Sequence, residues 1–344
     1  MRVLTAMSGG VDSSVAAALL LEEGHDVVGV TMKLWGGASD SGCCSVGDVE
    51  DARRVAQQLG VDHWVFNFSD EFDERVVAPY VAEHAAGRTP NPCIECNRHL
   101  KFDRLLERAG ALGFDAVATG HHARVVERDG GHRLLRGADR AKDQSYVLYV
   151  LGQQQLASIR LPVGEMTKAD VRARAAALGL RTAAKAESQD ACFVLASAGR
   201  RTFLSERIPL HAGRVVDTSG DVVGGVDAVE LVTVGQRRGL GVAGGPPRYA
   251  IDVDTARAVI TVGRGHDLLT DHVRLAGLTW VDESVSGAVN AQCRAHGDAV
   301  AARVDGDVVW FDEPHGRVAP GQSVVLYRGD EVVGGGIAVR DPRP

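Results

Sequence analysis

The first 200 residues alternate short apolar runs with stretches whose apolar residues recur at helical spacing. Strands are predicted at residues 3–7, 25–33, 63–68 and 116–119, and helices at residues 13–23 and 49–59. Such alternation is typical of a parallel sheet covered by helices. We therefore predict a doubly wound α/β domain, a fold that binds its ligands beyond the carboxyl ends of the strands.

The pattern changes after about residue 200, where short alternating runs are separated by glycine-rich turns and helical spacing nearly vanishes. Asp305-Gly306 lies between apolar runs at 301–304 and 308–311, and residues 328–330 lie between runs at 324–327 and 332–333. Residues that tolerate positive φ at such places indicate β-hairpins. We predict a catalytic domain over 1–199, a central β-rich domain over 200–270 and a C-terminal β-barrel over 271–344.

Composition narrows the class of protein. The 344 residues exceed what one hydrophobic core usually organises, and an apolar content of 45% supports several cores. We expect a soluble, cytoplasmic protein with no membrane association, because no apolar stretch approaches the ~20 residues of a membrane helix and no signal peptide precedes the first strand. The six cysteines are too few for a disulfide scaffold. The net charge of −7 argues only weakly against a nucleic-acid partner, since a local basic face matters more than the sum.

The sequence SGGVDSS at residues 8–14 lies between the first predicted strand and the first predicted helix. Glycines there let the backbone approach an anion, hydroxyl groups can donate hydrogen bonds, and the helix N-terminus adds partial positive charge. This pattern predicts a loop that grips a phosphate chain, although no Gly-Lys-Ser/Thr follows as in a Walker A loop. A glycine turn with Asp12 or Ser13 as an ordinary helix cap is the alternative.

Cysteines supply the second chemical signal. Pro90 and Pro92 make the segment 87–97 a stiff loop that enters a helix, and Cys96 would lie near its N-terminus, where a thiolate is favoured. Cys93-x-x-Cys96 could be half of a zinc site, but no second pair completes it. Cys192, between Ala191 and Phe193, would by itself be interpreted as a buried core cysteine.

The motifs together resemble the tRNA-specific 2-thiouridylase (MnmA) family of the PP-loop ATP pyrophosphatase superfamily, in order and over nearly the whole chain. The matching stretches are AMSGGVDSSV, the segment at 32–35, AGRTPNPCIECN, ATGHH, the LLRG-to-DQSY run at 134–146, PVGE, VGQRRGLG and PGQS.

The resemblance implies ATP-dependent 2-thiolation of the wobble uridine of tRNA. ATP would adenylate the C2 oxygen and a persulfide sulfur would replace it, with Cys192 as persulfide carrier and Cys96 as the nucleophile that releases the sulfur. It also implies Mg²⁺ near Asp12, and a cysteine desulfurase or relay protein as sulfur donor. The implied nucleotide-site positions are Ala6, Met7, Ser8, Gly9, Gly10, Val11, Asp12, Ser13, Met32 and Gly120.

Further positions correspond to tRNA contacts in the family: Asn91, Pro92, Cys93, His121, Lys142, Asp143, Gln144, Arg294 and Gln322. Ala295 follows Arg294 where some relatives have tyrosine, and Cys93 stands where many relatives have aspartate. The third thiol raises a second hypothesis, in which Cys93, Cys96 and Cys192 ligate a [4Fe-4S] cluster.

Other interpretations compete with these. Adjacent histidines on a strand point to opposite faces, so His121-His122 is a poor metal pair. Arg237-Arg238 is a solvated turn or a phosphate-contact loop. Among functions, other PP-loop synthetases share the ATP chemistry without needing the cysteines. An iron-sulfur redox or sensor protein with regulatory ATP binding is the alternative from another class.

Overall fold

The computed structural model describes residues 1–34, 46–186, 192–194 and 199–341; Cys43 and Cys44 lie outside these ranges. The chain divides into two compact units. The first unit comprises residues 1–76, 93–197 and 330–332, and the second unit comprises residues 77–92, 198–329 and 333–344.

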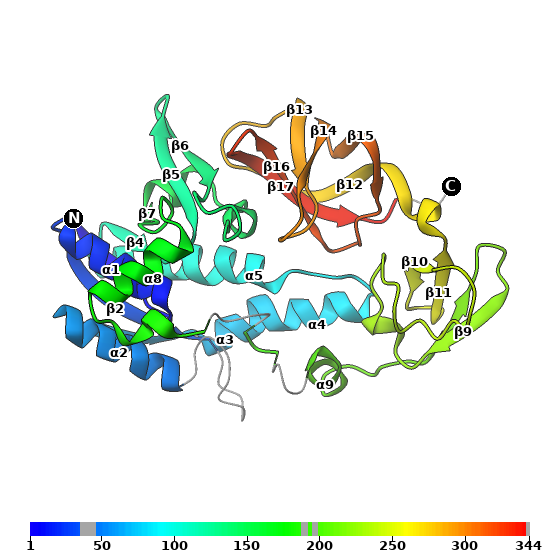
Figure 1. Ribbon diagram of the computed structural model, residues 1–344, viewed down its shortest axis with the longest axis horizontal. Coiled ribbons are helices and arrows are strands. Elements are labelled where there is room, and N and C mark those ends of the chain that lie inside the picture. Colours follow the sequence, from blue (N-terminus) through cyan, green and yellow to red (C-terminus); the bar gives the residue numbers. More distant parts are fainter. Residues whose placement is uncertain (35–45, 187–191, 195–198, 342–344) are drawn as a thin grey trace. The chain divides into compact units, whose positions relative to one another are not determined.

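The first unit contains a five-stranded parallel sheet in the order β3-β2-β1-β4-β7 (Figure 1). Its strands are β1 (Arg2–Ala6), β2 (Asp26–Lys33), β3 (His63–Asn67), β4 (Ala116–Ala118) and β7 (Ile159–Arg160). An antiparallel hairpin of β5 (Ala123–Arg128) and β6 (Gly131–Arg136) follows β4, and residues 331–332 pair with β6. The order reverses at β1, so the carboxyl ends of β1 and β4 flank the switch point, where ligands bind in such sheets.

Helical segments surround this sheet. They are α1 (Val11–Glu22), α2 (Val46–Leu59), α3 (Ser69–Phe72), η1 (Asp73–Val77), α5 (Pro92–Glu95), η2 (Cys96–Arg104), α6 (Leu105–Ala111), η3 (Ser145–Leu148), α7 (Gln153–Ala157), α8 (Lys168–Ala177) and η4 (Arg181–Ala184). α5, η2 and α6 follow one another without a gap, with η2 as a π-helical segment.

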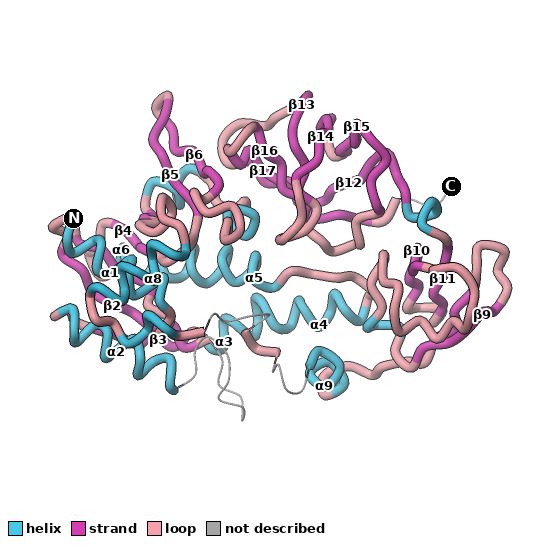
Figure 2. The backbone as a smooth tube through the Cα atoms, in the orientation of Figure 1, coloured by secondary structure: helices cyan, strands magenta, loops and turns pink. Residues whose placement is uncertain are grey.

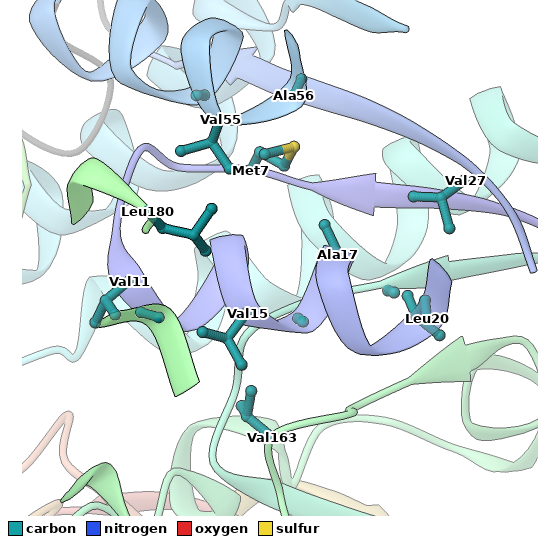
Figure 3. Packing of buried hydrophobic residues seen from close by; sticks show 14 of the residues in the cluster. Met7, Val11, Val15, Ala17, Leu20, Val27, Val55, Ala56, Val163 and Leu180 are labelled. Atoms are coloured by element: carbon teal, nitrogen blue, oxygen red, sulfur yellow. The ribbon is translucent and has the colours of Figure 1, made fainter. Parts of the chain in front are cut away.

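α1 is the central helix of the first unit. Eight of its 12 residues are buried, and they lie on more than one face, which explains why the sequence is not amphipathic. Val15 and Leu20 of α1 pack with Met7 at the end of β1, Val55 of α2 and Leu180 after α8 in one cluster (Figure 3). This packing fixes the N-terminus of α1 against the end of β1.

The second unit consists mostly of strands and loops (Figure 2). A four-stranded sheet in the order β10-β11-β8-β9 contains β8 (Gly213–Val216), β9 (Val222–Val226), β10 (Tyr249–Asp254) and β11 (Val259–Gly263). The barrel strands are β12 (Leu269–Trp280), β13 (Gly287–Gln292), β14 (Ala299–Asp305), β15 (Val308–Gly316), β16 (Ser323–Arg328) and β17 (Glu331–Val339). They run in the order β12-β15-β14-β13-β16-β17, and pairing of β12 with β17 closes the barrel. The helical segments are α4 (Ala78–Ala85), α9 (Gly199–Ser205), η5 (Val229–Leu231) and η6 (Gly265–Leu268).

The predicted fold class is confirmed, with a parallel α/β sheet followed by two β-rich parts, the last a barrel. Both predicted hairpins are present, with Gly306 at φ +57° and Gly329 at φ +60°. The expectation that helices nearly vanish after residue 200 missed α9, whose two arginines and short length give little periodicity. None of the described helices is long and apolar enough to cross a membrane.

Candidate functional site

The loop at residues 8–10 joins the carboxyl end of β1 to the N-terminus of α1. Gly9 has φ +71°, and a Cβ at this position would lie 2.3 Å from the carbonyl oxygen of Asp48, so only glycine fits. Gly10 is the N-cap of α1 and contributes no side-chain cap. The alternative in which Asp12 or Ser13 caps the helix is therefore wrong. The first turn of α1 instead points its amides toward the loop, as an anion site requires.

Hydroxyl groups shape the same loop. Ser13 Oγ lies 3.2 Å from both the Ser8 amide and the Gly10 carbonyl oxygen. Ser14 Oγ donates to the Gly10 oxygen at 2.8 Å and is fully buried. The buried hydroxyls of Ser13 and Ser14 thus both bond to the Gly10 carbonyl oxygen and hold the loop in place.

Asp12, in the first turn of α1, joins two side chains from distant parts of the chain. Lys168 Nζ donates to its carboxylate oxygens at 2.8 and 2.7 Å, and His122 Nε2 lies 3.1 Å from Oδ1. Burial would raise the pKa of Asp12, but the hydrogen bonds from His122 and Lys168 outweigh it and hold the pKa below its ordinary value of 3.8. Asp12 is therefore an anion at neutral pH, with its side chain 29% exposed.

Lys185 anchors the loop from another direction. Its Nζ donates to the Gly9 carbonyl oxygen at 2.9 Å and to carboxylate oxygens of Asp48 and Asp51 at 2.7 Å each. Burial would lower the pKa of Lys185, yet the bonds with these carboxylates raise it above its ordinary value of 10.5. This cation therefore fastens the phosphate loop to the start of α2.

Sequence reasoning did not identify Lys168, Lys185 or His122 as parts of this site. One local signal exists for Lys168: Thr167 and Asp170 form a capping box, which marks the start of α8 and places Lys168 in its first turn. No comparable local pattern marks Lys185.

Gly120 and Met32 were also predicted at the nucleotide site. A Cβ at Gly120 would lie 2.5 Å from the Ser13 amide nitrogen, so the segment after β4 touches the first turn of α1. Met32, in β2, is 8% exposed. Met7 and Val11 point into the core, at 1% and 4% exposure, so these two can serve a ligand only through their backbone.

All three cysteines of the predicted sulfur site belong to the first unit. Cys93 is exposed in the first turn of the helix that begins at Pro92, and Cys96 is buried at the start of its π-helical segment. Cys192 is partly exposed rather than a core residue; the neighbouring Phe193 is buried and packs edge-on against Phe72 with ring centroids 5.7 Å apart. Within the described residues, no three His, Cys, Asp or Glu side chains are grouped closely enough to hold a metal ion.

The predicted tRNA residues of the first unit differ in exposure. His121 is buried, with Nδ1 2.7 Å from Thr119 Oγ1 and its ring near Phe102; burial, and then Lys101, hold its pKa well below 6.5. Asp143 accepts hydrogen bonds from its own loop, whereas Gln144 is exposed and Lys142 partly exposed.

The remaining predicted tRNA residues, Asn91, Pro92, Arg294 and Gln322, belong to the second unit. The chain just before Asn91 is held there, because the Thr89 amide donates to the Pro320 carbonyl oxygen at 2.7 Å. Gly321, with φ +91°, approaches Thr89 so closely that a Cβ would lie 2.8 Å from its amide nitrogen. The guanidinium of Arg294 lies beside Gly235, in the loop that carries Arg237 and Arg238. Cys293 is a core residue, and burial raises the pKa of its thiol to about 12.

Known protein families match nearly the whole length of the chain. Family models described as a tRNA methyl transferase HUP domain, a tRNA methyl transferase PRC-barrel domain and an aminomethyltransferase beta-barrel domain match residues 1–196, 201–264 and 270–338. The tRNA-specific 2-thiouridylase MnmA of Roseiflexus sp. (strain RS-1) is 47% identical over 371 residues, covering 99% of this chain and 100% of the relative. The protein of the same name from Geotalea uraniireducens is 46% identical, covering 97% of this chain and 94% of the relative. The chain therefore belongs to the tRNA-specific 2-thiouridylase (MnmA) family.

Proposed function

We propose that the protein catalyses ATP-dependent 2-thiolation of the wobble uridine of tRNA in the cytoplasm. The observation that carries the proposal is the 47% identity to a tRNA-specific 2-thiouridylase over 99% of the chain. The phosphate loop, Cys96 and Cys192 all belong to the first unit, as a two-step reaction of this kind needs.

In the activation step, the C2 oxygen of the uridine attacks the α-phosphorus of ATP and pyrophosphate leaves. The first-turn amides of α1 and the Gly9-Gly10 loop bind the phosphate chain. The anionic carboxylate of Asp12 fits magnesium, a hard cation that neutralises phosphate charge, and Lys168 supplies a second cation beside it. Among the other predicted nucleotide-site residues, Ala6 lies at the end of β1, Met32 lies in β2, and Gly120 lies next to the first turn of α1.

In the transfer step, the terminal sulfur of a Cys192 persulfide attacks C2, and AMP leaves with the former C2 oxygen. The Cys96 thiolate then attacks the Cys192 sulfur, so the S–S bond breaks and the new sulfur stays on the tRNA. This leaves a disulfide between the two cysteines, which an external thiol must reduce. The partial exposure of Cys192 suits a carrier that a cysteine desulfurase or relay protein has to reload.

The iron-sulfur hypothesis finds no support in the arrangement of the cysteines. Cys93, Cys96 and Cys192 are all described, and they do not form a group that could hold a metal ion. A [4Fe-4S] cluster needs its thiolates to converge on one centre, and within the described residues the structure gives no evidence of such a centre. The persulfide route needs only Cys96 and Cys192 and gives Cys93 no part in sulfur transfer.

Substrate binding is assigned to residues of both units. We assign to tRNA contacts the first-unit residues Cys93, His121, Lys142, Asp143 and Gln144, and the second-unit residues Asn91, Pro92, Arg294 and Gln322. Arg294 and the Arg237-Arg238 loop would contact phosphates, which position tRNA without reading its sequence. We keep the domain boundaries at 199 and 270 as part of the proposal.

The decisive test is reconstitution. Purified protein, ATP, Mg²⁺, unmodified tRNA and a cysteine desulfurase with cysteine should yield 2-thiouridine at the wobble position, detected by mass spectrometry of tRNA nucleosides. One AMP and one pyrophosphate should appear per thiolated tRNA. The variants Asp12→Ala and Gly10→Val should abolish all three products. ATP cleavage with no 2-thiouridine under these conditions would contradict the proposal.

A further inference from the structure

The run that corresponds to a tRNA contact is bonded directly to a residue of the ATP site. Gln144 Oε1 accepts a hydrogen bond from the His122 amide at 2.9 Å, and the Gln144 amide donates to the His122 carbonyl oxygen at 2.9 Å. Gln144 is thus hydrogen-bonded to both the amide and the carbonyl oxygen of His122. Its side chain is nevertheless exposed, so a bound molecule can reach it.

The side chain of His122 connects Gln144 to Asp12, in the first turn of α1. Its residue is 2% exposed, and its Nε2 donates toward Asp12 Oδ1 at 3.1 Å. The opposite ring nitrogen, Nδ1, is buried and has no hydrogen-bond partner within the described part of the chain. The Asp12 contact is therefore what orients this ring, and a shift of the His122 backbone moves the ring against Asp12.

The surroundings of His122 leave little room for such a shift. A Cβ at Gly137 would lie 2.6 Å from the His122 carbonyl oxygen, so the neighbouring segment closes on it. The Gly137 amide donates to Asp143 Oδ1 at 2.9 Å, and Asp143 Oδ1 also accepts from the Ser145 amide at 3.0 Å. Residues of the shared motif from Leu134 to Tyr146 therefore pack closely against the His122 backbone.

We propose that Gln144 is a positioning residue for ATP cleavage: by holding the His122 backbone it fixes Asp12, so that tRNA engaged at residues 142–144 controls the rate of pyrophosphate release. The inference rests on the proposed function. Gln144 makes and breaks no covalent bond; it acts through His122 on the carboxylate that faces the phosphates. Binding of tRNA beside Gln144 and the first chemical step are thereby linked within the first unit.

The test compares Gln144→Leu, which removes the acceptor oxygen at similar size, with Gln144→Glu, which keeps an acceptor for the His122 amide. Pyrophosphate release is measured with saturating ATP over a range of tRNA concentrations. Gln144→Leu should lower kcat about tenfold, the scale of one lost partly buried hydrogen bond, and Gln144→Glu should restore it to within about threefold of wild type. KM for tRNA should rise for Gln144→Glu, because its new charge repels phosphate.

Gln153→Leu is the matched control. Gln153 also bonds both backbone groups of one residue, His132, but with its side chain alone: Oε1 accepts from the His132 amide at 2.7 Å and Nε2 donates to the His132 carbonyl oxygen at 2.8 Å. Gln153 has no assigned part in the site. Its kcat should equal that of wild type. If Gln144→Leu does not fold, Gln144→Asn replaces it, since its shorter side chain cannot reach the amide.

The possible outcomes distinguish a failure of the proposed function from a failure of the positioning role of Gln144. A wild-type enzyme that makes no 2-thiouridine in the reconstituted assay defeats the proposed function. A wild type that thiolates tRNA, together with an unchanged kcat for Gln144→Leu, overturns the positioning role alone. Equal kcat losses in Gln144→Glu and Gln144→Leu also overturn it, because they would show that the acceptor oxygen is not what matters.

Discussion

Replacing Gly120 by alanine should disable the phosphate loop although no residue of residues 8–14 is itself substituted. The new Cβ would lie 2.5 Å from the Ser13 amide nitrogen, 2.6 Å from the Asp12 carbonyl carbon and 2.9 Å from Asp12 Cβ. Ordinary contacts need about 3.5 Å, so the first turn of α1 must move by roughly 1 Å. A displacement of this size at a reacting centre costs about 100-fold in rate, and the overpacking costs about 1–3 kcal/mol of stability.

The assay is 2-thiouridine formation at saturating substrates, together with urea denaturation of the same preparation. Gly110→Ala is the control, because a methyl group added to this helical glycine of α6 would meet no atom within 4 Å and its φ is ordinary. That change should raise stability by about 0.5–1 kcal/mol and leave thiolation intact. A Gly120→Ala enzyme with wild-type rate and wild-type stability would refute the steric argument.

Three further predictions address other parts of the molecule. Cys192→Ser should still release pyrophosphate in the presence of tRNA but form no 2-thiouridine, whereas Cys93→Asp should keep thiolation. Loss of pyrophosphate release in a folded Cys192→Ser variant would contradict the division into two steps. Burial, and then Arg200, lower the pKa of His84 from 6.5 to about 4, so the unfolded chain binds the proton more tightly and stability falls as pH drops below about 6.5. Between pH 7 and pH 5, the free energy of unfolding should fall by about 2 kcal/mol more for wild type than for His84→Gln. An equal fall in both proteins would exclude His84 as the source of this pH dependence. Arg294→Ala should weaken tRNA binding and reduce the slope of log affinity against log salt by about 1, whereas Arg257→Ala, on an exposed turn, should leave the slope unchanged.

The sequence by itself predicted those features that depend on neighbouring residues. The glycines and serines of residues 8–14 mark the phosphate loop because a tight turn before a helix needs them in consecutive positions. Asp305-Gly306 and Arg328-Gly329-Asp330 mark hairpins because the turn geometry is set within two or three residues. The roles proposed for Cys96 and Cys192 in sulfur transfer rest on motif resemblance, which also compares the sequence position by position.

Only the tertiary structure decided which charges complete the site. Lys168 reaches Asp12 across 156 residues, Lys185 reaches Gly9 across 176, and His122 reaches Asp12 across 110. No local pattern encodes such partners, because their meeting depends on how α1, α8 and the segment after β4 pack at the carboxyl edge of one sheet. The sequence does not predict the hydrogen bonds between Gln144 and His122 either, because they go to backbone atoms of His122. Every residue has such atoms, so the identity of the side chain at position 122 does not mark it as a partner.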